Sequence, residues 1–359
     1  MILDFLIHKL TENKPPELNK DKCINYKKGD SCNKCKDFCT ENAVHIKDNE
    51  VIINENKCNQ CGICQVKCPT QAISIKGTGE EEILFAASEK KNLVFGCTLQ
   101  DVTGNLYISC LNSLHPEVLA LLFILYKEKE IYFNLSNCTD CELEIDNAIF
   151  NENLNKSISF VKCLGVDPSY EILKDENNIS ALITEEISRR NLFKLVKQES
   201  GSVVAKALNT IIDDKNQISY RSILLNYIKN LKVECEINYP DIFWEYWDVN
   251  IDCDVCGKCV SNCPGKAWNI ESDDKSLKLY YNFSSCYKCG LCEEVCPKNA
   301  ISKGKVNDFE LTKCKLQKEL HLATCKECNK KFVLHGMDEE KCNICKKKEL
   351  LRKKITTSI

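Results

Sequence analysis

Cysteines dominate the chemistry that this sequence can support. The chain of 359 residues contains 27 cysteines and 5 histidines. Three runs have the form Cys-x2-Cys-x2-Cys-x3-Cys-Pro, and they begin at Cys58, Cys253 and Cys286. Two-residue spacings let the backbone wrap around one iron-sulfur cube, so that three thiolates reach three irons while the fourth cysteine points toward a second cube. The runs therefore predict paired [4Fe-4S] clusters.

A fourth run, Cys23-x8-Cys32-x2-Cys35-x3-Cys39, is altered twice. Its first gap is longer, and Thr40 stands where the other runs have proline. Exchange of the fourth cysteine within each pair of runs predicts four ligand sets. They are Cys23, Cys32, Cys35 and Cys68; Cys58, Cys61, Cys64 and Cys39; Cys253, Cys256, Cys259 and Cys296; and Cys286, Cys289, Cys292 and Cys263. The longer loop at residues 25–30 leaves open whether Cys23 is a ligand.

At these residues the chain resembles bacterial-type dicluster ferredoxins and the ferredoxin-like domains of larger oxidoreductase complexes. The resemblance covers about a third of the chain. It implies a βαβ-βαβ fold in each of two modules and one-electron transfer between neighbouring cubes. The protein would set the potential through burial and through amide hydrogen bonds to sulfur. Zinc binding by the four runs is the alternative, and their spacing argues against it.

Five further cysteines lie between the two pairs of runs: Cys97, Cys110, Cys138, Cys141 and Cys163. Each is predicted to follow a strand, and the carboxyl ends of parallel strands meet at one edge of a sheet. Cys110 is predicted to open a helix that Ser113 caps, and a nearby helix N-terminus makes a thiol more acidic. The sequence therefore predicts that these thiols share a site.

The Cys110 turn and the loop Cys138-Thr139-Asp140-Cys141 make this segment similar to the small iron-sulfur subunit of methyl-viologen-reducing hydrogenases. That resemblance implies a [2Fe-2S] cluster, although Cys97 lacks the close second cysteine of that family. Three interpretations stay open: a fifth cluster or equivalent redox site, a docking domain with buried structural cysteines, and a catalytic thiol.

Two Cys-x2-Cys pairs lie near the end of the chain, at Cys325 with Cys328 and at Cys342 with Cys345. Their separation of 13 residues is typical of a zinc ribbon, in which four thiolates close a tetrahedron and the metal supplies most of the folding energy. A rubredoxin-type iron site is the alternative. Docking of a partner protein is the predicted role. Two other cysteines, Cys235 and Cys314, have no partner at ligand spacing and are predicted to be packing residues.

The elements that must position these cysteines follow from hydrophobic periodicity. Alternation predicts strands at residues 44–46, 51–53 and 73–75 of the first module and at 268–270 and 277–281 of the second. Between the modules, short buried strands at 93–95, 106–108 and 131–133 and a helix at 116–127 predict an α/β layer with a parallel sheet.

The predicted fold class is an α+β multidomain protein. It comprises a ferredoxin-like dicluster module (1–80), an α/β insert domain (81–187), a helical connector (188–248), a second ferredoxin-like module (249–306) and a zinc-ribbon-like tail (307–359). The cofactors expected are four [4Fe-4S] clusters and one zinc ion in the tail, and a [2Fe-2S] cluster is one of the open interpretations of the insert.

Charge and apolar patterning limit the function. The net charge of −3 argues against nucleic acid as a partner, and the apolar run at 118–126 is too short to cross a bilayer. The start of the chain lacks the basic region of a signal peptide, which predicts a cytoplasmic location where thiols stay reduced.

No Gly-rich dinucleotide fingerprint is visible, so substrate chemistry is expected in a partner oxidoreductase. The predicted function is that of an electron-transfer subunit or adaptor rather than a stand-alone enzyme. One alternative is an oxidoreductase that reduces thiols or sulfur compounds at Cys110 and the loop at 138–141. A further alternative is a redox-sensing regulator.

Overall fold

The structure, a computed structural model, describes a large part of the chain. The described residues are 15–27, 32–75, 80–141, 143, 146–177, 179–183, 220–230, 243–304, 314–334 and 339–356. They form two compact units: the first contains residues 1–244 and 287–289, and the second contains residues 245–286 and 290–359. Most of the predicted connector at 188–248 lies outside the described residues.

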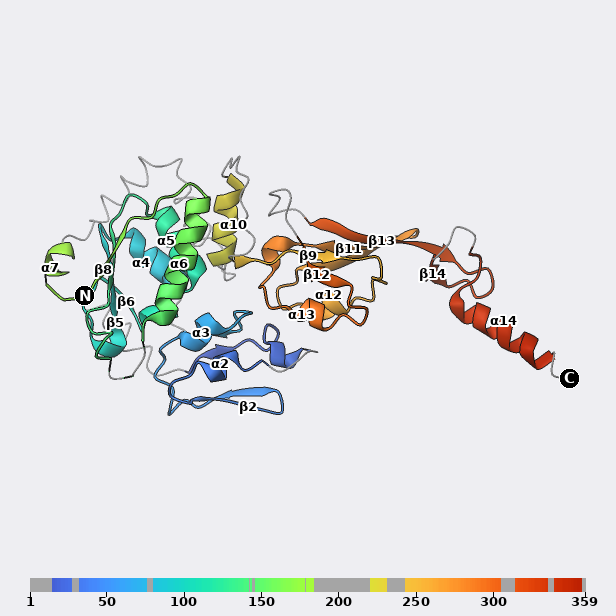
Figure 1. Ribbon diagram of the computed structural model, residues 1–359, viewed down its shortest axis with the longest axis horizontal. Helices are drawn as coiled ribbons and strands as arrows, with labels where there is room; N and C mark the ends of the chain where they lie inside the picture. Colours follow the sequence, from blue (N-terminus) through green and yellow to red (C-terminus); the bar gives the residue numbers. More distant parts are fainter. Residues whose placement is uncertain are drawn as a thin grey trace. The chain divides into compact units, whose positions relative to one another are not determined.

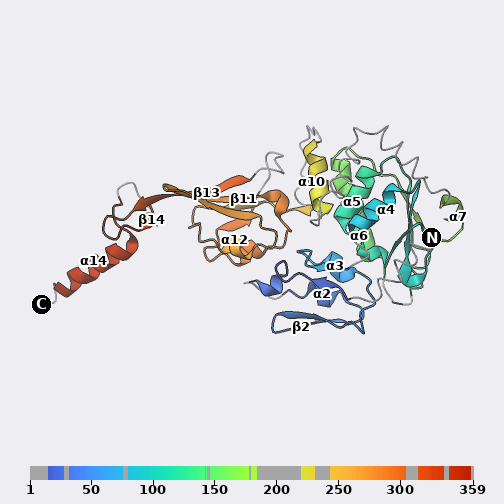
Figure 2. The same ribbon diagram turned by 180° about the vertical axis from the view of Figure 1, so that it is seen from behind.

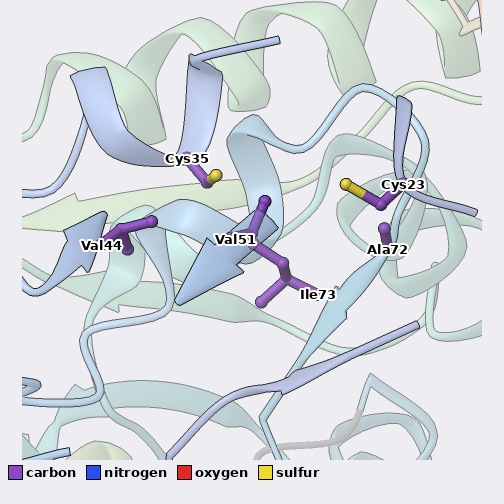
Figure 3. Packing of buried hydrophobic residues seen from close by; sticks show 6 residues of the cluster. All are labelled: Cys23, Cys35, Val44, Val51, Ala72 and Ile73. Carbon is purple, nitrogen blue, oxygen red and sulfur yellow. The ribbon is translucent and has the colours of Figure 1, made fainter. Parts of the chain in front are cut away.

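The N-terminal ferredoxin module is built from two βαβ halves. The first half contains β1 (Glu17–Leu18), α2 (Lys34–Asp37) and β2 (Val44–Lys47), and the second contains β3 (Glu50–Ile53), α3 (Ile63–Lys67) and β4 (Ile73–Ser74). β1 pairs with β4 and β2 pairs with β3, both antiparallel. The core is small and includes two cysteines: it comprises Cys23, Cys35, Val44, Val51, Ala72 and Ile73 (Figure 3).

The second ferredoxin module repeats this order of elements. Its strands and helices are β9 (Trp247–Val249), α12 (Lys258–Asn262), β10 (Trp268–Ser272), β11 (Ser276–Tyr281), α13 (Leu291–Glu294) and β12 (Ile301–Lys303). β9 pairs with β12 and β10 pairs with β11, again antiparallel. The internal repeat of the cysteine runs therefore has a counterpart in the fold.

The insert contains a four-stranded parallel sheet in the order β6-β5-β7-β8 (Figure 1). The strands are β5 (Leu93–Cys97), β6 (Leu106–Ile108), β7 (Ile131–Asn134) and β8 (Tyr170–Leu173), and the helices include α4 (Glu80–Ser88), α5 (Pro116–Leu125), α6 (Ala148–Cys163) and α7 (Ile179–Leu182). Strands β5 and β7 are buried along their whole length, as expected for strands covered on both faces.

The two faces of this sheet carry different helices, as both ribbon views show (Figures 1 and 2). Val94 and Tyr132 pack with Ile179 of α7 on one face. On the other face Phe133 lies 5.0 Å from Phe150 of α6, measured between ring centroids. This alternation follows from the two-residue period of a strand. Because all four strands are parallel, their carboxyl ends lie at one edge of the sheet.

Helix α10 (Tyr220–Asn230) packs against α5 through a buried ion pair. The Arg221 side chain donates to both carboxylate oxygens of Glu117, with Nε at 3.2 Å and 3.1 Å from them. The Glu117 side chain is 1% exposed and that of Arg221 is 10% exposed. The pair holds α10, which lies late in the sequence, on the first helix after the Cys110 turn.

The tail is continuous with the second module. The strand β13 (Lys315–Thr324) pairs with β11 through its first part and with β14 (Lys331–Val333) through its last part, so one sheet runs in the order β10-β11-β13-β14. A lysine-rich helix, α14 (Asn343–Thr356), follows. Neither β13 nor β8 is predicted from the sequence. Among the helices that the structure describes, none is long and apolar enough to cross a membrane.

Candidate iron-sulfur and metal sites

The structure gathers the cysteines of the N-terminal module into two groups. One cavity is lined by Cys23, Cys32, Cys35 and Cys68, and a second is lined by Cys39, Cys58, Cys61 and Cys64. Figure 3 shows the sulfur atoms of Cys23 and Cys35 pointing toward each other. Each group takes three cysteines from one run and one from the other, so the arrangement follows the exchanged pattern that the spacing predicts.

The second module shows the same exchange among its closest thiols. Burial, and after it the charge of Cys296 from the other run, raises the pKa of Cys253. Burial also raises the pKa of Cys259 to about 12, with smaller contributions from Cys253 and Cys256. For the remaining group, burial and then Cys286 raise the pKa of Tyr281, and Cys292 and Cys263 add to the effect. Cys289 belongs to the same run as Cys286.

One turn recurs in all four runs. The N–H of an alanine donates to the Sγ of the fourth cysteine at 3.2–3.3 Å: Ala43 to Cys39, Ala72 to Cys68, Ala267 to Cys263 and Ala300 to Cys296. The residue before each alanine has a positive φ, namely Asn42, Gln71, Lys266 and Asn299. The first run keeps this turn although Thr40 replaces its proline. Hydrogen bonds of this kind to ligand sulfur orient the thiolate and tune the potential of a cluster.

Asn25 holds Cys23 beside Cys32 despite the long spacing between them. The Asn25 side-chain amide donates to the Cys32 carbonyl at 2.9 Å, and the Cys32 N–H donates to Asn25 Oδ1 at 2.6 Å. Asn25 is buried, and Cys23 is 8% exposed. The sequence does not identify this contact, because a single asparagine in a polar loop carries no periodic signal. The contact removes the main objection to Cys23 as a ligand.

Burial favours the protonated form of two of the most enclosed thiols, Cys35 and Cys64. It raises the pKa of Cys35 to about 12, and Cys68, Cys32 and Cys23 contribute further. The pKa of Cys64 is also raised, first by burial and then by Cys61 and Cys58. Iron binds the thiolate form, so cluster assembly must release these protons, and the positive charge of the irons replaces them.

Four of the five insert cysteines come together at the carboxyl edge of the parallel sheet. Cys97 ends β5, Cys110 follows β6, and Cys138 follows β7, the three strands being neighbours. A hydrogen bond with Cys110 lowers the pKa of Cys97 to about 7. Burial raises the pKa of Cys138 to about 11, with added effects from Cys97 and Cys141. The group therefore offers four thiols from three neighbouring strand ends as candidate metal ligands.

Three expectations for the insert are wrong. Cys163 does not follow a strand: it is the last residue of α6, whose carboxyl end leads back to the start of β8. Cys110 opens only a 3-10 turn, η3 (Leu111–Ser113), and α5 begins after His115, whose side chain accepts from the Glu117 N–H at 3.3 Å. The acidic thiol is Cys97 rather than Cys110. The hydrogen bond between the two residues raises the pKa of Cys110, and burial raises it further.

The four thiols of the tail lie close together. The sulfur atoms of Cys325, Cys328, Cys342 and Cys345 are all within 4.8 Å of one another, and those of Cys328 and Cys342 are 3.8 Å apart. Four sulfurs at about 2.3 Å from one ion form a tetrahedron with edges of about 3.8 Å. The Cys342 N–H donates to Cys325 Sγ at 3.3 Å, which lowers the pKa of Cys325 to about 6. This group fits a single ion.

Two cysteines, Cys314 and Cys235, belong to none of these groups. Cys314 is exposed, so its interpretation as a packing residue is wrong. Cys235 lies outside the described residues.

Comparison with known protein families finds a match in each of the two modules. Residues 252–300 match the family of 4Fe-4S dicluster domains, and residues 51–74 match the family of 4Fe-4S binding domains. An uncharacterized ferredoxin of Methanocaldococcus jannaschii is 39% identical over 46 residues, which are 13% of this chain and 69% of that protein. The chain belongs to the ferredoxin family.

The chain spans only a small part of the length of two further relatives. The polyferredoxin protein MvhB of Methanothermus fervidus is 36% identical over 75 residues, and that of Methanothermobacter marburgensis is 36% identical over 72 residues. The matches cover 19% and 17% of this chain and 18% of each polyferredoxin. The likeness therefore concerns the ferredoxin segments, and the chain is an iron-sulfur, ferredoxin-like protein.

Proposed function

We propose that this chain is an electron-transfer protein that relays single electrons through four [4Fe-4S] clusters, to or from a partner oxidoreductase. The observation that carries the proposal is the repeated site: cysteines of four runs gather in the exchanged pattern, and each fourth cysteine accepts the same alanine N–H. The ligands are the four sets listed above, Cys23 included. When bound, cubes of this kind take up and release one electron each.

The insert and the tail extend this proposal. Cys97, Cys110, Cys138 and Cys141 are proposed to hold a fifth centre with two irons, and Cys163 is not one of its ligands. The four tail thiols are proposed to hold one structural zinc ion. The similarity to polyferredoxins named MvhB supports a redox protein as the partner.

Metal analysis of anaerobically purified protein tests the assignment. We expect about 18 irons and one zinc per chain, of which four cubes contribute about 16 irons. A reductive titration followed by electron paramagnetic resonance (EPR) should take up about five electrons per chain, one for each iron-sulfur centre. A total near eight irons, or clusters that stay oxidised down to about −700 mV, would overturn the relay.

A second candidate function uses the same insert thiols as an enzyme site. It is favoured by the hydrogen-bonded pair of Cys97 and Cys110, in which the pKa of Cys97 is lowered to about 7, because a thiolate at neutral pH is a nucleophile. Replacing Cys138 and Cys141 by serine separates the two functions. Loss of two irons from the double variant supports a cluster. Turnover of a polysulfide by the purified chain, with reduced methyl viologen as the electron source, supports an enzyme.

A further inference from the structure

The backbone of the N-terminal module comes close to the insert at Gly62. This residue follows Cys61 and precedes α3, and its φ is +82°. A Cβ atom built on Gly62 would lie 2.5 Å from the Cβ atom of Ser113 in η3. A side chain at this position would therefore face two penalties, one from the left-handed conformation and one from the collision with Ser113.

This approach is not a general property of the cysteine runs. Gly257 and Gly290 hold the same place in their runs, and both have a φ of +77°. A Cβ atom on Gly257 would meet only Ile270 Cδ1, at 3.4 Å, and one on Gly290 would meet nothing within 4 Å. The left-handed turn thus belongs to the motif, whereas the tight contact belongs to the run that begins at Cys58.

The contact joins two groups of metal ligands. Gly62 is bonded to Cys61, and Ser113 is tied to Cys110 because its hydroxyl donates to the Cys110 carbonyl at 2.7 Å. Cys61 directly precedes Gly62 in the sequence, and Cys110 precedes Ser113 by three residues. Two buried apolar residues flank the contact, Ile63 and Leu111, each 2% exposed.

A polar contact reinforces the junction nearby. Lys67 at the end of α3 donates to Glu152 of α6 at 2.9 Å. Glu152 also accepts from Lys156 one turn further along α6, and these two hydrogen bonds lower the pKa of Glu152 to about 2. The carboxylate is therefore charged at neutral pH and holds both lysines. The module and the insert are fixed to each other by backbone, apolar and ionic contacts around the same two cysteines.

We propose that Gly62 and Ser113 form an electron-transfer junction, in which Cys61 and Cys110 carry electrons between the N-terminal module and the insert site. This inference rests on the proposed function, since it requires redox centres on both sides. The electron balance is simple: one side loses one electron, the other gains one, and no bond forms or breaks. The group of Cys39, Cys58, Cys61 and Cys64 is thereby the partner of the insert site at this junction.

Magnetic coupling in the fully reduced protein tests the junction. In the wild type we expect the EPR signal of the insert centre to be split and to relax fast, because of its paramagnetic neighbour. In Gly62→Ala we expect the splitting and the fast relaxation to be lost while the iron content stays at the wild-type value. Ser113→Gly removes the Cβ atom that collides, so the double variant Gly62→Ala/Ser113→Gly should regain the coupling.

Two further variants control the test. Gly290→Ala imposes the same left-handed strain on a run without the contact, and it should keep the coupling of the insert centre. Ser113→Leu adds bulk from the insert side and leaves every residue of the cysteine run unchanged, so it covers the case in which Gly62→Ala does not assemble its cluster. Ser113→Leu should lose the coupling.

The outcomes separate this inference from the proposed function. Unchanged coupling in Gly62→Ala or Ser113→Leu, with full iron content, would overturn the junction and leave the relay intact. The same conclusion follows if the wild type carries iron in the insert but shows no coupling. An insert without iron would overturn the fifth centre and the junction together, and metal analysis identifies that result directly.

Discussion

Asn25 joins the two parts of the irregular first run through its side-chain amide. Replacement by alanine removes both hydrogen bonds to Cys32 and leaves a partly buried N–H and carbonyl without their partner, at a cost of about 1–3 kcal/mol. We expect Asn25→Ala to lose its first cube, about four irons per chain, during purification. Asn33→Ala is the matched control, because Asn33 is exposed and makes no capping hydrogen bond with its side chain. Equal iron content in the two variants would contradict the prediction.

Cys23 itself provides a second test at this scale. Because Cys23 is buried against Cys32, Cys35 and Cys68, we expect Cys23→Ala to lose about four irons per chain. Cys314→Ala serves as the control, since Cys314 is exposed and lies at no metal site. Iron analysis and the intensity of the EPR signals report the difference. A full complement of iron in Cys23→Ala would remove Cys23 from the ligand set.

The sequence predicts the ligand residues better than the contacts that hold them. Cluster geometry demands fixed spacings, so the positions of the runs can be found without a structure. Asn25 and the close approach of Gly62 to Ser113 follow no spacing, and they become visible only when distant segments meet. The acidity of Cys97 is a similar case, because it depends on Cys110 from the next strand.

Helix α10 depends on one buried ion pair for its place on α5. Arg221→Leu leaves the Glu117 carboxylate buried and unpaired, which should lower the free energy of unfolding by about 3–5 kcal/mol. Urea unfolding followed by circular dichroism measures the change. The control is Lys156→Ala, which removes an ion pair whose side chains are 46% and 47% exposed and should cost less than about 1 kcal/mol. Equal midpoints for the two variants would show that the buried pair does not hold the helix.

The proposed zinc site is expected to stabilise the fold of the tail. Cys345→Ser removes one of four ligands, so we expect the loss of one zinc per chain with no change in iron. Limited proteolysis should then cleave within α14 of the variant and not of the wild type. Cleavage of both proteins at equal rates would mean that the tail folds without metal.

Elements were predicted where hydrophobic periodicity is strong. The buried strands β5, β6 and β7 and the helix α5 agree with the sequence to within a few residues, because their faces alternate or repeat clearly. Strands β8 and β13 were missed. Both are partly exposed, and β13 carries mostly charged and polar residues, so its conformation is decided by pairing with β11 rather than by its own pattern.

At the scale of the whole molecule, the chain forms two compact units. Replacing cluster ligands in one unit should therefore leave the metal content of the other unit unchanged. We expect Cys259→Ala/Cys292→Ala to lose about eight irons and to keep about ten. The matched variant is Cys35→Ala/Cys64→Ala, which removes a ligand from each group of the N-terminal module. The EPR signals that remain should be those of the untouched unit. Loss of nearly all iron from Cys259→Ala/Cys292→Ala would show that the units do not assemble independently.

Strand β13 lies beyond the domain boundary predicted at residue 306, and yet it pairs with strand β11 of the module. Cysteine spacing separates a ferredoxin module from a ribbon, but hydrogen bonding joins them, since residues 315–321 of β13 complete the sheet of the module and residues 322–324 belong to the ribbon. Spacing identifies where metals bind, and it carries no information on which strands share a sheet.

The shared strand has a consequence for anyone who shortens the chain. A protein that ends at Gly304 would keep every cysteine of the four runs and would lose β13, the partner of β11 from Ser276 to Tyr281. The N–H and carbonyl groups of that edge would then be free to pair with the same edge of another molecule. We expect such a truncated protein to bind its clusters and yet to self-associate, so that aggregation after removal of the tail would report an uncovered sheet edge rather than a missing metal.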